Sequence, residues 1–301
     1  MLSAAIALIG ALVYGSADFF GGLAARRLRS IVVSAVSAFA GLIALGLILP
    51  IAGGVWTTED VLWGVLAGLF GIIALALLYA CLAIGPMSIL SPLTAVVSAI
   101  APMVWGLTVN GETLSGLGYA GLAVALVAVV LVGFIPGEKV VRPQVRGVVM
   151  GVGAGLAIGA FLIVIDRTND ASGIVPLLVS RATNTVVTTV IVGVLMLIAI
   201  RRGRRPMAAL DVGDTTTVSP RATRGRAALF AVACGVLDAA ANTIMLFALR
   251  LGDLAVVSAL TALYPAGTIL LAALVLGERV ARVQWTGLAL AIIAGGMLGL
   301  A

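Results

Sequence analysis

The sequence predicts an all-α integral membrane protein with ten transmembrane helices, arranged as two inverted five-helix repeats. Three observations support this prediction: the composition, the length of the apolar runs and an internal repeat. Hydrophobic residues make up 62% of the 301-residue chain and charged residues only 10%, with a mean hydropathy of +1.25. A soluble protein is about one quarter charged. So few charges cannot cover a water-facing surface, and a lipid bilayer is the expected solvent.

Ten apolar runs follow one another along the chain, and each is close to the roughly 20 residues that a helix needs to cross a bilayer. A Gly-Pro pair at 85–86 separates the third run from the fourth, because the residue before a proline avoids the helical conformation. The expected spans are 2–24, 31–51, 61–84, 87–109, 116–135, 147–165, 174–200, 227–249, 254–276 and 283–300.

Two polar segments interrupt the apolar pattern. Residues 136–146 (PGEKVVRPQVR) lie between the fifth and sixth spans, and residues 201–226 follow the seventh span. The second segment is rich in Arg, Thr, Gly and Pro, a composition typical of loops. We expect 136–146 to be a linker and 201–226 to be a long polar loop.

An internal repeat joins the two halves of the chain. GPMSILSPLTA (85–95) and GDLAVVSALTA (252–262) are identical at 5 of 11 positions. Further along, GETLSGLGYAGLAVA (111–125) matches GERVARVQWTGLALA (277–291): each has Gly-Glu, then an aromatic residue seven positions after the Glu, then Gly-Leu-Ala. Two matches at nearly the same offset indicate that spans three to five are duplicated as spans eight to ten.

The duplication defines the domain organisation. We expect a first five-helix repeat over 1–135, a linker over 136–146 and a second repeat over 147–301. Because five is an odd number, the second copy enters the membrane from the opposite side. Such an inverted-topology repeat is common in secondary transporters.

The repeated segments also resemble a known family. The run LYPAGTILLAALVLGERV (263–280), with the paired Gly-Glu before the fifth and tenth spans, is similar to the drug/metabolite transporter superfamily, EamA type. The first unit departs from this pattern, because Pro102 stands closer to the Glu in APMVWGLTVNGE (101–112). The resemblance extends over essentially the whole chain. It implies a transporter of small metabolites, often an exporter, with a central cavity between the two halves.

Two residue types of the repeat have expected structural roles. Glu112 and Glu278 lie at span ends, where we expect them to cap helices and anchor the membrane interface. Pro102 and Pro265 lie in the fourth and ninth spans, which we expect them to kink, so that freed carbonyl groups line a cavity.

The distribution of positive charge predicts the orientation in the cell membrane. Of the 18 Lys and Arg residues, 15 fall in the odd-numbered connections between spans. The positive-inside rule therefore places these connections in the cytoplasm and both termini outside. The family resemblance implies termini inside; the charge count is the better physical argument, and we follow it.

Asp18 is the first charge of the chain and lies in the first span, within YGSADFFGG (14–22). At about 1.5 Å per residue, it is roughly 8–9 Å from the face that carries the odd-numbered connections. A charge inside a span is costly and marks a candidate functional site. We consider Asp18, with Tyr14 one turn earlier, as a proton-coupling or gate site. The alternative is a structural Asp near the helix end that reaches the membrane interface or pairs with Arg26 or Arg27.

Arg181 and Asp238 are the other charges deep inside spans. The seventh and eighth spans run in opposite directions, so Arg181 and Asp238 fall within roughly one helical turn of each other in depth. A buried ion pair would neutralise both. Together with Asn184, Asn242 and Tyr264, these residues are the candidate substrate-binding group. The pair is either a permanent structural contact or a gate at which substrate competes for one partner.

These features favour transport over catalysis. The chain has no His and no metal-binding pattern, ATP site or nucleophile–base pair, so we expect neither an enzyme nor a cofactor. We expect a secondary transporter of small metabolites that exports them by alternating access around a midplane cavity, with proton coupling as one option. An importer or exchanger, a lipid-linked-sugar translocase and a non-transporting scaffold remain alternatives. One Arg and two Asp fit an amino acid and a cationic compound equally well. We expect no nucleic-acid partner and either a monomer or a homodimer.

Overall fold

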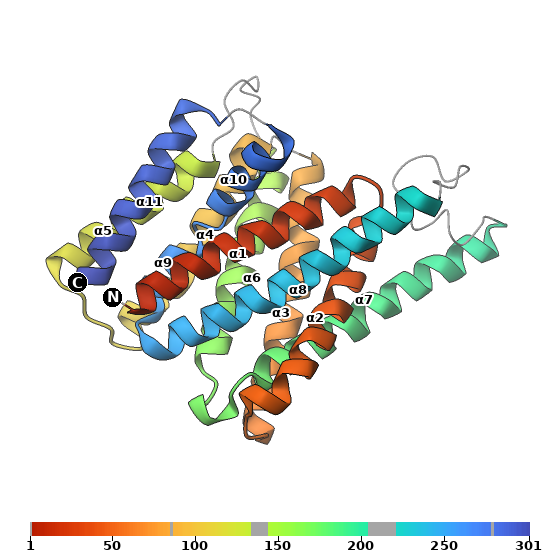
Figure 1. Cartoon of the computed structure of the whole chain (residues 1–301), viewed down its shortest axis with the longest axis horizontal. Coiled ribbons are helices and arrows are strands. Elements are labelled where there is room, and N and C mark those ends of the chain that lie inside the picture. Colours follow the sequence, from red (N-terminus) through yellow and green to blue (C-terminus); the bar gives the residue numbers. More distant parts are fainter. Residues whose placement is uncertain (1, 85–86, 134–143, 204–220, 278–279) are drawn as a thin grey trace.

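The computed structural model describes residues 2–84, 87–133, 144–203, 221–277 and 280–301 (Figure 1). Over these residues the regular structure is entirely helical. The helices are α1 (Leu2–Ala25), α2 (Ser30–Ala52), α3 (Thr58–Ile84), α4 (Met87–Thr108), α5 (Gly116–Gly133), α6 (Val145–Asp166), the short η1 (Asp170–Ser172), α7 (Val175–Arg201), α8 (Arg221–Leu251), α9 (Leu254–Thr261), α10 (Pro265–Leu276) and α11 (Arg282–Leu300).

Each expected span coincides with helical structure. Within the described part of the chain, nine helical segments are long and apolar enough to cross a membrane, and α9 with α10 counts as one of them. The fourth expected span contains the shorter apolar helix Pro92–Thr108. The chain is therefore a multi-pass membrane protein.

The two expected polar connections are shorter than predicted. Helix α6 begins at Val145 and helix α8 at Arg221, so the end of the linker 136–146 and the end of the loop 201–226 are helical. These parts of the two predictions are wrong, because polar residues can extend a helix beyond the membrane surface. The central parts of both connections lie outside the described residues.

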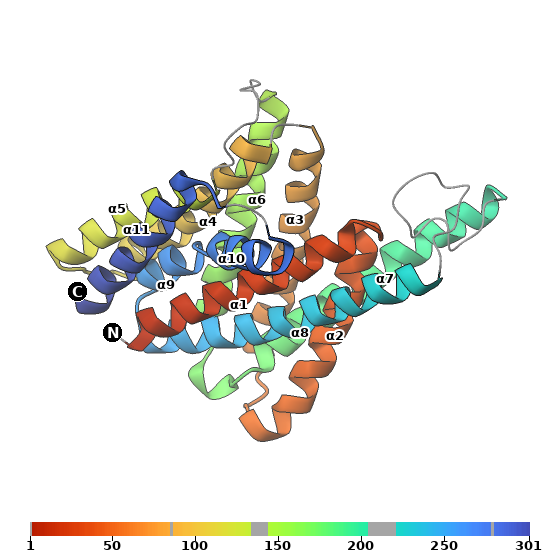
Figure 2. The ribbon, with the colours of Figure 1, turned by 45° about the horizontal axis from the view of Figure 1, so that its top comes forward.

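The helices form two groups, each of which contains helices from both halves of the chain. In the α1–α8 group, α1 packs along α8, α2 packs against α8, and α1 also contacts α9 and α10. In the α3–α6 group, α3 packs along α6, α7 packs against α3, and α4 packs against α6. Contacts of α2 with α7 and of α4 with α9 join the groups. Helices α5 and α11 pack side by side at one end (Figures 1 and 2).

Small residues allow these helices to approach closely. Helices gain little hydrophobic free energy by associating in lipid, so van der Waals contact between backbones matters more. A Cβ at Gly15 of α1 would collide with the backbone around Tyr264, and the Thr268 hydroxyl donates to the Gly15 carbonyl oxygen at 2.9 Å. Gly235 of α8 lies in the same way against the backbone of Ser37 in α2.

The ninth span is broken between α9 and α10. Pro265, which lacks an N–H, begins α10, and the bonds from Leu263 N to Leu260 O and from Tyr264 N to Thr261 O are of the tighter i→i−3 type. All eight residues of α9 are buried. Pro265 therefore interrupts the α-helix, and a short turn with i→i−3 hydrogen bonds joins α9 to α10. At Pro102 the helix α4 is assigned as one continuous helix.

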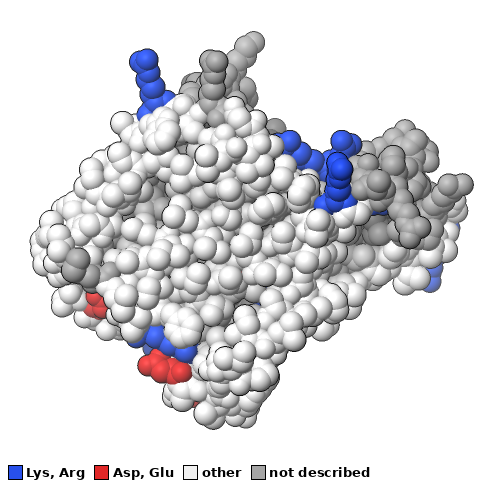
Figure 3. Space-filling view, in the orientation of Figure 1, with Lys and Arg blue, Asp and Glu red and all other residues white. Residues whose placement is uncertain are grey.

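The two water-facing ends of the bundle differ in charge: acidic side chains appear at one end beside some Arg, and basic side chains at the other (Figure 3). The start of α1, the end of α11 and the even-numbered connections share one end, on which both termini lie (Figure 1). This acid-rich face contains Glu59, Asp60, Glu112, Asp166, Asp170 and Asp253. The opposite Arg-rich face contains Arg26, Arg27, Arg29, Arg146, Arg202, Arg224, Arg226 and Arg282.

Candidate functional site

A cavity of about 180 Å³ lies between the helices of both groups. Its wall is formed by α1, α3, α4, α6, α7, α8 and the break between α9 and α10. The wall includes six of the seven residues that we singled out in the sequence: Tyr14, Asp18, Arg181, Asn184, Asp238 and Tyr264. The seventh, Asn242, is buried one turn behind Asp238, and its Nδ2 donates to the Asp238 carbonyl oxygen at 2.8 Å.

Arg181 of α7 and Asp238 of α8 form an ion pair in the cavity wall. The pairing that we expected from their depth in the membrane is present. Their side chains are only 15% and 17% exposed, so the pair is largely sheltered from solvent. The stem of Arg181 passes near Gly41 of α2, where a Cβ would be in ordinary contact with Arg181 Cδ at 3.5 Å. The tighter neighbour of Gly41 is the Gly235 carbonyl oxygen, at 3.0 Å from such a Cβ, so this glycine serves the contact of α2 with α8.

The polar stripe that follows Arg181 on α7 faces protein. The Thr185 hydroxyl donates to the Arg181 carbonyl oxygen at 2.8 Å, and the Thr188 hydroxyl donates to the Asn184 carbonyl oxygen at 2.5 Å. These hydroxyls are satisfied within their own helix. The Asn184 Oδ1 atom, by contrast, is buried and has no hydrogen-bond partner within the described part of the protein. It is a free acceptor in the cavity wall.

Asp18 is exposed although it lies on a membrane-spanning helix. It opens into the cavity, and no ion pair among the described residues includes it. The alternative in which Asp18 pairs with Arg26 or Arg27 is therefore wrong: α1 continues to Ala25, and both arginines are exposed beyond its end.

Two tyrosines flank the open part of the cavity. Tyr14 lies one turn before Asp18 on α1, and Tyr264 lies at the break between α9 and α10. Their ring centroids are 6.0 Å apart at an interplanar angle of 51°. The Tyr14 hydroxyl also neighbours the Asp238 carboxylate. The cavity thus contains the Arg181–Asp238 pair, the carboxylate of Asp18 and two aromatic rings, and Tyr14 lies next to both the pair and Asp18.

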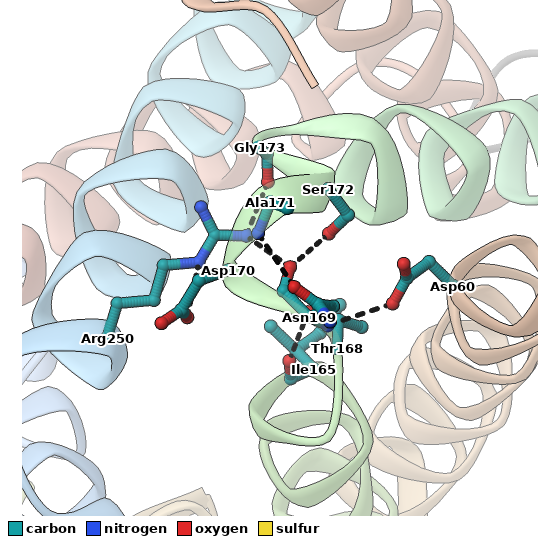
Figure 4. Close-up of polar contacts among 9 residues, drawn as sticks. All are labelled: Asp60, Ile165, Thr168, Asn169, Asp170, Ala171, Ser172, Gly173 and Arg250. Carbon is teal, nitrogen blue, oxygen red and sulfur yellow. Dashed lines mark hydrogen bonds and ion pairs between the residues drawn. The ribbon is translucent and has the colours of Figure 1, made fainter. Parts of the chain in front are cut away.

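At the acid-rich face, Arg250 makes a polar contact between the two helix groups (Figure 4). This residue, at the end of α8, donates to the carbonyl oxygens of Gly173 at 2.6 Å and Asn169 at 3.4 Å. Its Nε lies 3.5 Å from Asp170 Oδ1. Arg250 therefore holds the α6–α7 connection against the α1–α8 group.

Asp60 holds the same connection from its other side (Figure 4). Its side chain lies at the start of α3 and is only 2% exposed. It accepts hydrogen bonds from the Asn169 backbone N–H at 2.9 Å and from the Thr57 hydroxyl at 2.6 Å. Asp60 thus fixes the α6–α7 connection within the α3–α6 group, so that the carbonyl groups that accept from Arg250 are held in place.

Glu112 makes the second contact between the groups. Its carboxylate accepts hydrogen bonds from the backbone N–H groups of Leu254 at 3.0 Å and Ala255 at 2.9 Å. The expected capping role is confirmed, but the capped helix, α9, belongs to the other half of the chain. Its repeat counterpart, Glu278, lies outside the described residues. Sequence reasoning missed Arg250 and Asp60, since both look like ordinary charges at helix ends.

Among the described residues, no group of three or more His, Cys, Asp and Glu side chains could hold a metal ion. The chemistry that the cavity offers is recognition by charge, hydrogen bonding and aromatic contact.

Comparisons with known proteins agree with this architecture. The model of the EamA-like transporter family matches residues 145–299, slightly more than half of the chain. Among curated proteins there is no match. A solved structure described only as "Crystal structure of protein" superposes with a TM-score of 0.72 at 15% identity, covering 100% of this chain and 99% of that one. At this identity the likeness concerns the fold alone.

Proposed function

Because this chain belongs to the EamA-like transporter family, we propose that its cavity is the substrate site of a secondary transporter that works by alternating access. Family membership makes the protein a membrane transporter of small molecules. The observation that supports the site most directly is the placement of Asp18, Arg181 and Asp238. All three lie deep in spans and line one cavity, whereas charges inside a bilayer without a role are rare.

The helix contacts support an inverted repeat as the basis of alternation. In an inverted repeat, each helix of the first half has a counterpart in the second half, so each contact should have an equivalent contact. The contact of α1 with α8 is equivalent to that of α6 with α3, and the contact of α2 with α8 is equivalent to that of α7 with α3. All four contacts are present, and the contacts α2–α7 and α5–α11 are each their own equivalent. The close approach of Gly235 to Ser37 similarly corresponds to that of Gly68 to the Ser180 carbonyl oxygen. Two equivalent halves can exchange conformations and so move access from one face to the other.

The described state is closed at the acid-rich face. Arg250 and Glu112 both join the two helix groups there, and we propose that these contacts break when the cavity opens to that side. The lining residues run from Phe161 and Met245, near the acid-rich ends of α6 and α8, to Asp18 and Leu78, nearer the Arg-rich ends of α1 and α3. Because the polar contacts of Arg250 and Glu112 lie at the acid-rich face, we propose the Arg-rich face as the side of access in this state.

The positive-inside rule makes the Arg-rich face cytoplasmic, so this state receives substrate from inside the cell and fits an exporter.

A cysteine at Val55, in the connection between α2 and α3, should react with an impermeant thiol reagent in intact cells. A cysteine at Arg26 should react only after the membrane is opened. The reverse labelling pattern would place both termini in the cytoplasm.

We propose Asp18 as the coupling carboxylate, because it is the accessible acid of the cavity and lies outside the Arg181–Asp238 pair. The test begins with cells that overproduce the protein. Metabolites that they release are compared with those released by cells with a variant combining Asp18→Asn, Arg181→Gln and Asp238→Asn. Released compounds specific to the wild type are then added to proteoliposomes containing a pH-sensitive dye.

Substrate-dependent proton movement that is lost in Asp18→Asn is the expected result. Intact coupling in this variant would exclude the role of Asp18. Equal release of every metabolite by wild type and triple variant, with both proteins present in the membrane, would instead favour a non-transporting scaffold.

A further inference from the structure

The charge balance of the cavity bears on the class of substrate, an inference that rests on the proposed function because it concerns the same cavity. Among the described lining residues, three are charged: Asp18, Arg181 and Asp238. Arg181 and Asp238 neutralise each other. With Asp18 ionised, these groups leave the cavity with one net negative charge.

The aromatic rings beside Asp18 favour the same kind of ligand. Tyr14 is on the same helix one turn away, and the ring of Tyr264 lies against that of Tyr14, with the centroids 6.0 Å apart. The face of an aromatic ring attracts a cation through the ring quadrupole. A carboxylate and two tyrosine rings around one space therefore stabilise a positively charged group that has left water.

An unpartnered acceptor in the wall adds a preference for hydrogen-bond donors. Asn184 Oδ1 is buried and, within the described protein, has no hydrogen-bond partner. A carbonyl oxygen can only accept, and leaving it unpaired is costly. A ligand with N–H groups would satisfy it, whereas a carboxylate would not.

A zwitterion would need a second, positively charged anchor for its carboxylate. Arg181 is the cation of the described wall, and it is already bound to Asp238. Taking Arg181 away would leave Asp238 as an uncompensated buried charge, which is strongly unfavourable. The ion pair therefore argues against an amino acid as substrate, although an unpaired Arg and an unpaired Asp would suit the two charges of an amino acid.

We propose that the cavity binds a protonated organic amine with an apolar body. The ammonium group lies by Asp18 and beside the contacting rings of Tyr14 and Tyr264. The apolar body lies against Leu75, Leu78 and Phe161, which line the same cavity.

The test is isothermal titration calorimetry of the purified full-length protein in detergent with four probes that share one ring. Phenethylamine is a cation, phenylalanine a zwitterion, 3-phenylpropionate an anion and 2-phenylethanol neutral. We expect phenethylamine to bind at least about tenfold more tightly than the other three, since it alone pairs its charge without breaking the ion pair.

Variants identify the residue responsible. Asp18→Asn should reduce the affinity for phenethylamine to that for 2-phenylethanol, whereas Asp18→Glu should keep the preference for the amine. Glu59→Gln, which removes an exposed acid on the acid-rich face, is the matched control and should bind like wild type. Size-exclusion profiles establish that each variant is folded.

Phenylalanine binding as tightly as the amine, no binding of the amine, or unchanged amine binding in folded Asp18→Asn would each overturn the proposal. Binding in detergent requires no transport, so the two proposals fail separately. A protein that exports metabolites but prefers phenylalanine contradicts only the amine inference. One that binds amines through Asp18 but exports nothing contradicts only the transporter.

Discussion

Arg181 and Asp238 show how single residues remain charged inside a membrane protein. Each would be costly alone, and the other removes that cost. We therefore expect Arg181→Met and Asp238→Leu, made singly, each to destabilise the fold by about 3–5 kcal/mol, because each leaves one uncompensated buried charge. The double variant should be much more stable than the sum of the single losses suggests. Thermal unfolding in detergent, followed by tryptophan fluorescence, measures the stability of the wild type, the two single variants and the double variant.

An additive result would mean that the two side chains do not interact. Val55→Ala, an exposed position outside the spans, controls for non-specific effects of mutagenesis. The pairing could be predicted because depth along two antiparallel spans is a simple function of residue number. The contacts of Asp18 could not, because depth alone does not say whether a side chain faces a cavity or an arginine at the helix end.

At the scale of elements, the contact of α1 with the break between α9 and α10 depends on Gly15. A Cβ there would collide with the Tyr264 carbonyl oxygen, whereas a Cβ at Gly22 on the same helix meets nothing within 4 Å. Alanine is favoured over glycine within a helix by about 1 kcal/mol. We expect Gly22→Ala to be neutral or stabilising and Gly15→Ala to lower the unfolding temperature. Equal unfolding temperatures for the two variants would contradict this packing.

The helices themselves were largely predictable, because lipid requires long apolar segments with satisfied backbones. The break in the ninth span was not. Pro102 and Pro265 give the same local signal, yet α4 is continuous at Pro102 and the ninth span is interrupted at Pro265. A glycine of a neighbouring helix packs against both sites, Gly15 against the backbone beside Pro265 and Gly159 against Pro102, so this packing does not account for the difference. The start of α8 at Arg221 was also missed, because polarity excludes a residue from lipid but not from a helix.

At the scale of the whole molecule, the contacts of Arg250 predict a role for this residue in the closure of the acid-rich face. Hydrogen bonds that involve a charged group contribute about 1.5–3 kcal/mol each. Arg250→Gln should therefore shift the population towards a state open at this face. The measurement is electron paramagnetic resonance of spin labels at Val109 and Leu251, one on each helix group, in a protein whose Cys81 and Cys234 are replaced by alanine. We expect longer distances in the variant.

Arg282→Gln, on the Arg-rich face, is the matched control and should leave the distances unchanged. Identical distributions for Arg250→Gln and its parent would exclude a role in closure. Sequence reasoning could not foresee this contact, because Arg250 reaches Asn169 and Gly173 across 81 and 77 positions of the chain. Glu112 reaches α9 across more than 140 positions, and only its capping tendency was local enough to predict.

The complete burial of α9 has a consequence for how the protein is made. Helix α9 is buried at all eight positions, although with α10 it forms one apolar segment of 23 residues. Its native surroundings are therefore protein rather than lipid, and they are complete only when its neighbours are in place. Its neighbours α1, α4 and α8 precede it in the chain and can already provide a protein surface. During biogenesis, the ninth span should leave the insertion machinery directly into this surface, so that its assembly is a step of tertiary folding rather than of partitioning into lipid.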